Sequence, residues 1–265
     1  MRQGAVFGLL AATAFAGVAY AEDPPPFTGD PTWAARGLLG YSKTTGNTDT
    51  TTGNFLFHAA KLVGSNWKFL FGTEGLYGSN HGETTAQAWD LHLQANYNVS
   101  DRMFVYGSGR YDDDRFSGFA YQASLSAGLG YDFIKTDATK LSAQVGVGAR
   151  KLQTELLVKD DVGGVVSRTK LDTSSEVVLD AAANFEHSFN ASTKILAAVT
   201  MQSGSDNTLT TGRIGLQVKM TGTLALAAGW QMTNNSKPPP GSGKTDSLTT
   251  LSVVYEVKNP KLAPE

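Results

Sequence analysis

The stretch AWDLHLQANYNV, residues 88–99, alternates between apolar and polar side chains along its whole length. One parity holds Trp89, Leu91, Leu93, Ala95, Tyr97 and Val99, and the other holds Asp90, His92, Gln94, Asn96 and Asn98. Successive side chains of a β-strand point to opposite faces, so the pattern predicts a strand with one apolar and one polar face. In a soluble sandwich the apolar face would cover a core. In a membrane barrel it would face lipid, and the polar face would line a lumen.

The N-terminal segment MRQGAVFGLLAATAFAGVAYA predicts export. It has one charged residue, Arg2, then an apolar run, then the tripeptide Ala19-Tyr20-Ala21. These features are typical of a secretory signal peptide, residues 1–21, cleaved after Ala21. The sequence contains no Cys, which excludes a lipoprotein anchor, disulfides, a thiolate metal site and a Cys nucleophile.

The composition narrows the class of protein further. The chain carries 22 Lys and Arg against 24 Asp and Glu, a net charge of −2, which gives no electrostatic case for binding nucleic acid. No apolar run after the signal approaches the ~18 residues of a transmembrane helix. If the mature chain is in a membrane, it must therefore be a closed barrel, because lipid satisfies no exposed backbone group.

The same alternation recurs along the chain and predicts about twelve strands. Clear examples are FAYQASLSAGLGYDF, residues 119–133, and EVVLDAAANFEHSF, residues 176–189. The segment MFVYGSGRYD is ambiguous, and we expect Arg110 to point inward there. We predict three parts after the signal. They are a periplasmic lead-in at residues 22–32, an outer-membrane β-barrel at 33–257 and a periplasmic tail at 258–265.

The connections between these strands alternate in length. VGSN and SDR are short, whereas GSNHGETTAQ and the long segment at residues 152–174 are not. Bacterial outer-membrane barrels have short periplasmic turns and longer extracellular loops, and an even number of strands puts both termini in the periplasm. We expect the segment 152–174 to be a loop that either constricts the lumen or covers its mouth.

Aromatic residues fall where an outer-membrane barrel would need them. Trp33 and Tyr41 lie eight residues apart on one predicted outer face, and Trp89 and Tyr97 repeat that spacing. Eight residues of a tilted strand climb roughly 20 Å, close to the ~25 Å apolar band that aromatic girdles flank. The predicted interfacial girdle comprises Trp33, Tyr41, Trp67, Tyr77, Trp89, Tyr97, Tyr131, Phe133, Trp230 and Tyr255. The alternative is that these aromatic side chains fill a soluble core.

Two stretches resemble a known family. LLGYSKTTGNTDTTTGNF, residues 38–55, and DDRFSGFAYQASLSAGLGYDF, residues 113–133, are similar to the salt-induced outer-membrane proteins, the YdiY-like family. The resemblance covers most of the chain after residue 32. It implies an outer-membrane β-barrel of undefined activity and supplies no catalytic residues. One departure is the end of the chain, where KNPKLAPE follows the last strand although substrates of the outer-membrane assembly machinery commonly end on an aromatic residue.

Charged residues occupy the predicted inner face. The set is Arg36, Lys68, Glu74, Asp90, His92, Arg110, Asp132, Arg150, Glu176, Asp180, Arg213 and Lys219. The two signs are nearly balanced, and charges in a poorly hydrated space should pair. The set is either a network that braces the barrel or the lining of a narrow, weakly selective pore. Eight strands give a filled interior and sixteen an aqueous channel, so twelve is intermediate.

The sequence offers only weak candidates for an enzymatic site and a metal site. A lipid hydrolase would need an outward Ser–His pair, and His187 faces outward with no evident Ser beside it. The carboxylates Asp112, Asp113 and Asp114 are a weak candidate for a loop metal site, although they do not match EF-hand spacing.

The sequence thus predicts an all-β fold, a transmembrane up-and-down antiparallel β-barrel of about twelve strands in the outer membrane of a Gram-negative bacterium. The leading function is a non-enzymatic barrel and narrow pore without a cofactor. A role in envelope or salt and osmotic stress is implied by the resemblance alone. The expected partners are outer-membrane lipid, lipopolysaccharide and, during biogenesis, the assembly machinery, with the oligomeric state left open. The alternatives are a lipid-modifying outer-membrane enzyme and a soluble secreted β-sandwich binding module.

Overall fold

The computed structural model describes residues 32–44, 50–159, 165–221, 224–238 and 244–258. The predicted signal peptide and nearly all of the two periplasmic segments lie outside the described residues. Within the described part of the chain, no helix is long and apolar enough to cross a membrane.

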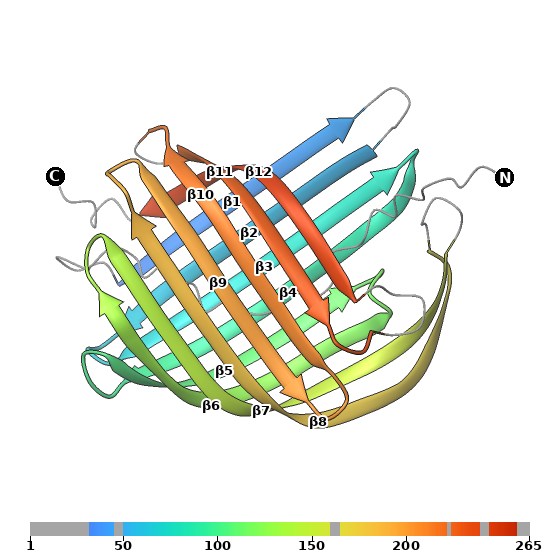
Figure 1. The fold of residues 1–265 in the computed structure, drawn as a ribbon, viewed down its shortest axis with the longest axis horizontal. Coiled ribbons are helices and arrows are strands. Elements are labelled where there is room, and N and C mark those ends of the chain that lie inside the picture. The colour runs from blue at the N-terminus through green and yellow to red at the C-terminus, as the bar shows by residue number, and fades with distance from the viewer. Residues whose placement is uncertain (1–31, 45–49, 160–164, 222–223, 239–243, 259–265) are drawn as a thin grey trace.

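Twelve antiparallel strands close into one barrel, as predicted (Figure 1). They are β1 (Trp33–Thr44), β2 (Thr50–Val63), β3 (Trp67–Asn80), β4 (Glu83–Asn98), β5 (Met103–Asp114), β6 (Phe119–Lys135), β7 (Thr139–Lys159), β8 (Val165–Ser188), β9 (Thr193–Gly204), β10 (Thr208–Lys219), β11 (Leu224–Asn235) and β12 (Thr245–Lys258). Each strand pairs with its neighbours in sequence, and β1 pairs with β12 to close the wall, with Ala34 opposite Lys258. The fold is therefore an up-and-down barrel, and the β-sandwich alternative is wrong.

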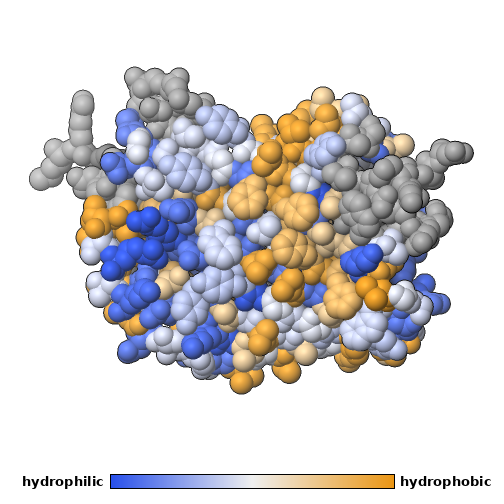
Figure 2. All heavy atoms as spheres, turned by 180° about the vertical axis from the view of Figure 1, so that it is seen from behind, coloured by the Kyte–Doolittle hydropathy of each residue, from blue (hydrophilic) through white to orange (hydrophobic). Residues whose placement is uncertain are grey.

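The outer wall is apolar around its middle. Leu125 on β6 and Val177 on β8 are 72% and 76% exposed, and Leu251 on β12, across the barrel from β6, is 77% exposed. Figure 2 shows hydrophobic residues gathered in a belt across the face, with hydrophilic residues toward one end. A continuous apolar belt of this kind is what a barrel presents to the hydrocarbon of a membrane.

One end of the barrel, the short-turn end, carries the tight β2–β3, β4–β5, β6–β7 and β8–β9 turns together with the start of β1 and the end of β12. Side chains cap these turns locally. Asn190 Oδ1 accepts hydrogen bonds from the backbone N–H groups of Ser192 and Thr193, both at 2.9 Å, and Thr136 Oγ1 accepts one from the N–H of Thr139 at 2.9 Å. Asn, Ser and Thr side chains favour such turns because they replace a backbone partner.

The opposite end, the hairpin end, corrects the expected loop at residues 152–174. Its described residues, 152–159 and 165–174, are strand: β7 and β8 continue past the wall side by side, with Glu155 opposite Lys170 and Leu157 opposite Arg168 (Figure 1). The ion pair from Arg168 Nη2 to Glu155 Oε2, at 2.6 Å, links the two strands. Backbone pairing between β7 and β8 therefore continues beyond the wall.

The expected β3–β4 loop is also shorter than predicted. β3 and β4 run to a turn at His81 and Gly82, both with positive φ, 49° and 85°. Two central residues with positive φ match the right-handed twist of hairpin strands, and Gly adopts that conformation without steric cost.

Glycines also set the closeness of β6 and β7. Gly128 and Gly146 are partners in the ladder and both face inward. A Cβ added to Gly128 would lie 2.2 Å from the carbonyl oxygen of Val145, so only glycine permits this approach. Glycine at such a position lets a strongly curved wall close.

Candidate functional site in the lumen

The predicted charged set lies on the inner face of the wall. Glu74, Asp90, His92, Arg110, Arg150 and Glu176 are buried, Arg36, Lys68, Asp132, Asp180 and Arg213 are half-buried, and Lys219 is exposed at the last position of β10. The inner face of each strand is therefore the face that the alternation predicted, and Arg110 points inward as expected.

A first cluster joins β4 and β5. Arg110 and Asp112 share the inner face of β5, and Arg110 Nε donates to Asp112 Oδ2 at 2.7 Å. Asp112 is the ladder partner of Asp90, which brings Asp90 Oδ2 to 3.4 Å from Arg110 Nη2. One guanidinium thus contacts two carboxylates that face each other across neighbouring strands.

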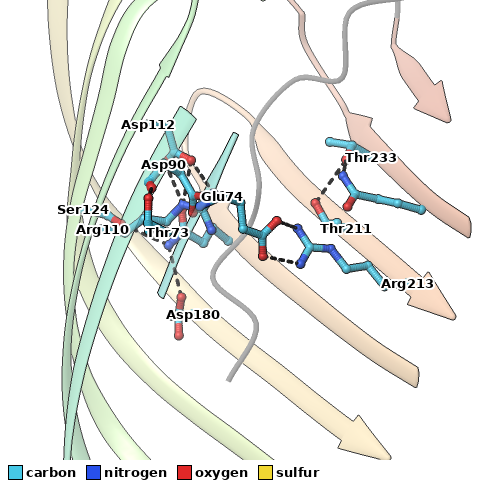
Figure 3. Close-up of polar contacts among 12 residues, drawn as sticks. Thr73, Glu74, Asp90, Arg110, Asp112, Ser124, Asp180, Thr211, Arg213 and Thr233 are labelled. Atoms are coloured by element: carbon cyan, nitrogen blue, oxygen red, sulfur yellow. Dashed lines mark hydrogen bonds and ion pairs between the residues drawn. The ribbon is translucent and has the colours of Figure 1, made fainter. Parts of the chain in front are cut away.

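A second ion pair crosses the lumen. Arg213 on β10 donates through Nη1 and Nη2 to Glu74 Oε1 and Oε2 on β3, at 3.0 and 3.2 Å. β10 and β3 lie on opposite sides of the barrel order, and Figure 3 shows the two side chains reaching toward each other. His58 Nε2 lies 3.5 Å from the same carboxylate. The two-point geometry is the strong form of an arginine–carboxylate contact.

A third cluster lies toward the hairpin end. Arg150 on β7 and Glu176 on β8 are ladder partners, and Arg150 Nη2 donates to Glu176 Oε1 at 2.5 Å. Arg150 Nη2 also donates to the side-chain and backbone oxygens of Asn207 in the β9–β10 turn. Only 2% of Arg150 is exposed, so its charge is compensated inside the protein.

Neutral side chains extend these links across the lumen. The contacts are Tyr106 Oη to Asp180 Oδ1 at 3.0 Å, Gln202 Nε2 to Asp180 Oδ2 at 3.2 Å and to Ser124 Oγ at 3.3 Å, Gln94 Nε2 to Gln144 Oε1 at 3.3 Å, and Arg36 Nη2 to Gln217 Oε1 at 2.7 Å. The sequence-based selection of charged residues missed the amides and Tyr106. Their inward parity on predicted strands was the signal that could have found them.

The structure also contains a cavity of about 190 Å³. Its lining includes Arg36, Glu74 and Arg213, together with apolar side chains. Because it touches both β2–β3 and β9–β11, which lie on opposite walls, the cavity lies in the lumen beside the Arg213–Glu74 pair.

The candidate metal carboxylates do not converge. Asp112 and Asp114 share the inner parity of β5, and Asp113 lies on the other parity. Asp112 binds Arg110, and Asp114 Oδ1 accepts from the N–H of Phe116 at 2.9 Å in the β5–β6 turn. Among the residues placed in the structure, no group of three or more His, Asp or Glu side chains is arranged to hold a metal ion.

His187, the outward histidine considered for hydrolase chemistry, has a hydroxyl partner of another type. Its Nδ1 lies 2.8 Å from Thr139 Oγ1 on the neighbouring strand. The ring lies between Phe185 and Phe189, with centroids at 6.5 and 4.9 Å. The described neighbours of this ring are a Thr hydroxyl and two Phe rings, whereas the enzyme alternative requires an outward Ser.

The predicted girdle residues lie on the outer wall. Tyr41, Trp67, Tyr77, Trp89, Tyr97, Tyr131, Phe133, Trp230 and Tyr255 are all exposed, and the side chain of Trp33 lies outside the described residues. Near the short-turn end, Trp67 packs edge-on against Tyr97 at 5.1 Å. Near the hairpin end, Trp89 packs against Tyr111 at 5.5 Å. Their interfacial role stays a prediction.

Comparison with known proteins gives the following likenesses. The uncharacterized protein YdiY of Escherichia coli (strain K12) is 23% identical over 263 residues, covering 97% of this chain and 96% of that protein. The COG4313 outer membrane channel from Pseudomonas putida F1 is 11% identical, with a TM-score of 0.49, and covers 89% of this chain and 99% of that chain. The translocator domain of autotransporter NalP from Neisseria meningitidis is 14% identical, with a TM-score of 0.48, and the match covers 86% of this chain and 90% of that chain.

The likeness to YdiY agrees with the resemblance drawn from residues 38–55 and 113–133, which is confirmed at the level of the family. The model of the family described as protein of unknown function, DUF481, matches residues 38–257. This chain belongs to that family.

Proposed function

We propose that this protein is a non-enzymatic outer-membrane barrel whose lumen is a narrow, weakly selective passage for small solutes. Three features support the proposal: the closed wall, the apolar belt on its outside and the charged lining on its inside. A barrel with an apolar exterior and a polar interior separates lipid from a hydrated space.

The observation that carries the proposal is the balance of charge in the lumen. Arg110, Arg150 and Arg213 each contact carboxylates, in three separate clusters spread around the wall. A lining whose charges neutralise one another gives neither a cation nor an anion a favoured path. The Arg213–Glu74 pair joins opposite walls, so the passage is narrow at that level.

The cellular setting belongs to the same proposal. We infer export by the N-terminal segment, residence in the outer membrane of a Gram-negative bacterium, and contact with its lipid and lipopolysaccharide. The role in envelope or salt and osmotic stress rests on the family resemblance, and the barrel fold supports assembly by the outer-membrane machinery.

Ion selectivity tests the proposal. The protein, purified in detergent and inserted into a planar bilayer, is placed in a tenfold KCl gradient. The expected result is a measurable current with a reversal potential close to zero, because the lining is nearly neutral. A reversal potential near the limit for K⁺ or Cl⁻ would contradict weak selectivity. Absence of current from protein shown to be folded by a heat-dependent gel shift would favour the bracing network instead.

A further inference from the structure

The β1–β12 ladder, which closes the barrel, stops before its two strands do. It ends at Gly40 opposite Ser252, although β1 continues to Thr44 and β12 begins at Thr245. At this end of the barrel, each of the other ladders reaches to within one residue of the end of its shorter strand. Beyond Gly40, β1 stays paired with β2, and the facing part of β12 stays paired with β11. Within the described residues the two strands therefore run apart toward the hairpin end (Figure 1).

The seam opening, the gap between residues 41–44 of β1 and 245–251 of β12, lies at the edge of the apolar belt. Leu251 is the last apolar residue on the outer face of β12 in this direction, and the next outward residue, Thr249, is polar and exposed. Tyr41, a predicted girdle residue, directly follows the last paired residue of β1. Unpaired backbone groups are not tolerated in hydrocarbon, whereas water and lipid headgroups satisfy them. We therefore place the opening at the membrane interface, on the side that the proposed orientation assigns to the outer leaflet.

The lumenal cavity lies directly behind the seam opening. Its lining includes Leu38 from β1 and both Leu248 and Thr250 from β12, the two strands that run apart there. Leu38 lies two residues before the end of the ladder, and Thr250 lies two residues beyond it. The cavity, of about 190 Å³, therefore adjoins the opening as well as the lumen.

The lumen beside the opening is apolar. Leu248 packs against a buried cluster of Leu76, Ala86 and Ala88 on the inner face of β3 and β4, and Leu56 on β2 also lines the cavity. Inward positions of a water-filled barrel are ordinarily polar. An apolar lining that continues to a gap in the wall favours apolar molecules over water between the lumen and the lipid.

We propose that the seam opening is a lateral route by which small apolar molecules move between the lumenal cavity and the outer leaflet. The route needs the outer mouth, the cavity and the opening, but no path to the short-turn end. The inference therefore goes beyond the proposed passage and stands without it, because ion current across a bilayer tests the passage and lateral access tests the opening. The competing explanation is an irregular rim, which predicts that lipid does not reach inward side chains.

Single cysteines test whether lipid reaches the cavity, because the native chain contains no Cys. A phospholipid with a maleimide headgroup, mixed into the bilayer of reconstituted vesicles, should label Thr250→Cys inside the opening as well as Leu251→Cys on the outer wall. Ser126→Cys, inward on β6 and paired with a strand on each side, is the matched control and should stay unlabelled. Labelling of Leu251→Cys without Thr250→Cys, or equal labelling of Thr250→Cys and Ser126→Cys, overturns the proposal.

Uptake of an apolar probe tests the transport itself. N-phenylnaphthylamine, which fluoresces on entering hydrocarbon, is added to Gram-negative cells that produce the protein and to cells that lack it. Cells with the native protein should take up the probe faster. Leu38→Asn should remove most of that gain, because it makes the route polar at a similar side-chain size.

The control for this variant is Leu209→Asn, which changes a buried inward leucine that does not line the cavity and should retain the gain. Leu56→Asn is the second cavity variant if a heat-dependent gel shift shows that Leu38→Asn does not fold. Equal uptake with the cavity and the control variants, or no gain with the native protein, overturns the proposal.

Discussion

At the scale of single residues, the interior depends on arginines that are buried with their acceptors. Arg150 reaches both Glu176 on the adjacent strand and Asn207 in a turn, and it is among the most completely buried side chains of the described chain. Burying a charge is costly, and removal of one partner leaves the other uncompensated. The contacts of Arg150 should therefore contribute to the free energy of unfolding.

Arg150→Ala should lower the free energy of unfolding by about 3–5 kcal/mol, because Glu176 then stays buried without its guanidinium. Equilibrium unfolding by urea in lipid vesicles measures this change. The control is Lys151→Ala, an exposed neighbour on the outer parity, whose effect should stay within about 0.5 kcal/mol. Equal decreases in the free energy of unfolding of the two variants would show that the Arg150–Glu176 pair does not stabilise the barrel.

Gly128→Ala should destabilise the barrel by about 1–3 kcal/mol, since its Cβ would overlap the backbone at Val145. Gly107→Ala is the matched control on the adjacent strand β5, because a Cβ there meets no atom within 4 Å. The temperature at which the folded band disappears from a heat-dependent gel shift reports the difference. Unfolding of both variants at the same temperature would contradict the close approach of β6 and β7.

At the scale of strands, alternation predicted the number of strands and the inner parity, and the lengths of the connections together with the aromatic spacing favoured the closed barrel. It did not predict where strands end at the hairpin end. The segment 152–174 mixes charged and apolar residues, so it was predicted as a loop, yet β7 and β8 pair along its described part. Backbone pairing there depends on the partner strand, which a single-strand pattern does not contain. The β3–β4 turn was missed for a local reason, since His81 takes the positive φ usually filled by Asn or Gly.

The girdle on β3 and β4 should act as a coupled pair. Trp67 and Tyr97 are ladder partners with ring centroids 5.1 Å apart. In a double-mutant cycle of Trp67→Ala and Tyr97→Ala, urea unfolding should give a coupling free energy of about 0.5–1.5 kcal/mol. The control cycle combines Tyr97→Ala with Tyr255→Ala, which lies on a distant strand, and should be additive. Additivity in both cycles would show that the contact between Trp67 and Tyr97 does not contribute to the free energy of unfolding.

At the scale of the whole molecule, the cross-lumen contacts lay beyond sequence reasoning. Arg213 and Glu74 are 139 residues apart, and their meeting depends on barrel closure, on register and on the height of each residue in the wall. Parity places both in the lumen but gives no partner. The cavity is hidden for the same reason, because its leucines and glycines come from strands at both ends of the chain.

The placement of the whole barrel in a membrane predicts a depth for each exposed tryptophan. In single-tryptophan variants that retain Trp67 or Trp89, lipids brominated near the headgroup should quench fluorescence more than lipids brominated near the chain end, because girdle aromatics lie at the interfaces. Fluorescence that no brominated lipid quenches would contradict membrane insertion.

The central claim is that a continuous but narrow passage crosses the barrel and is constricted where Arg213 meets Glu74. Single-channel recording in planar bilayers tests it most directly, with the native protein compared with the double variant Glu74→Ser, Arg213→Ser. The account predicts small, discrete steps for the native protein and larger steps for the double variant, because shorter side chains no longer bridge the walls. Silent bilayers from folded native protein, or steps of equal size in the two proteins, would contradict it.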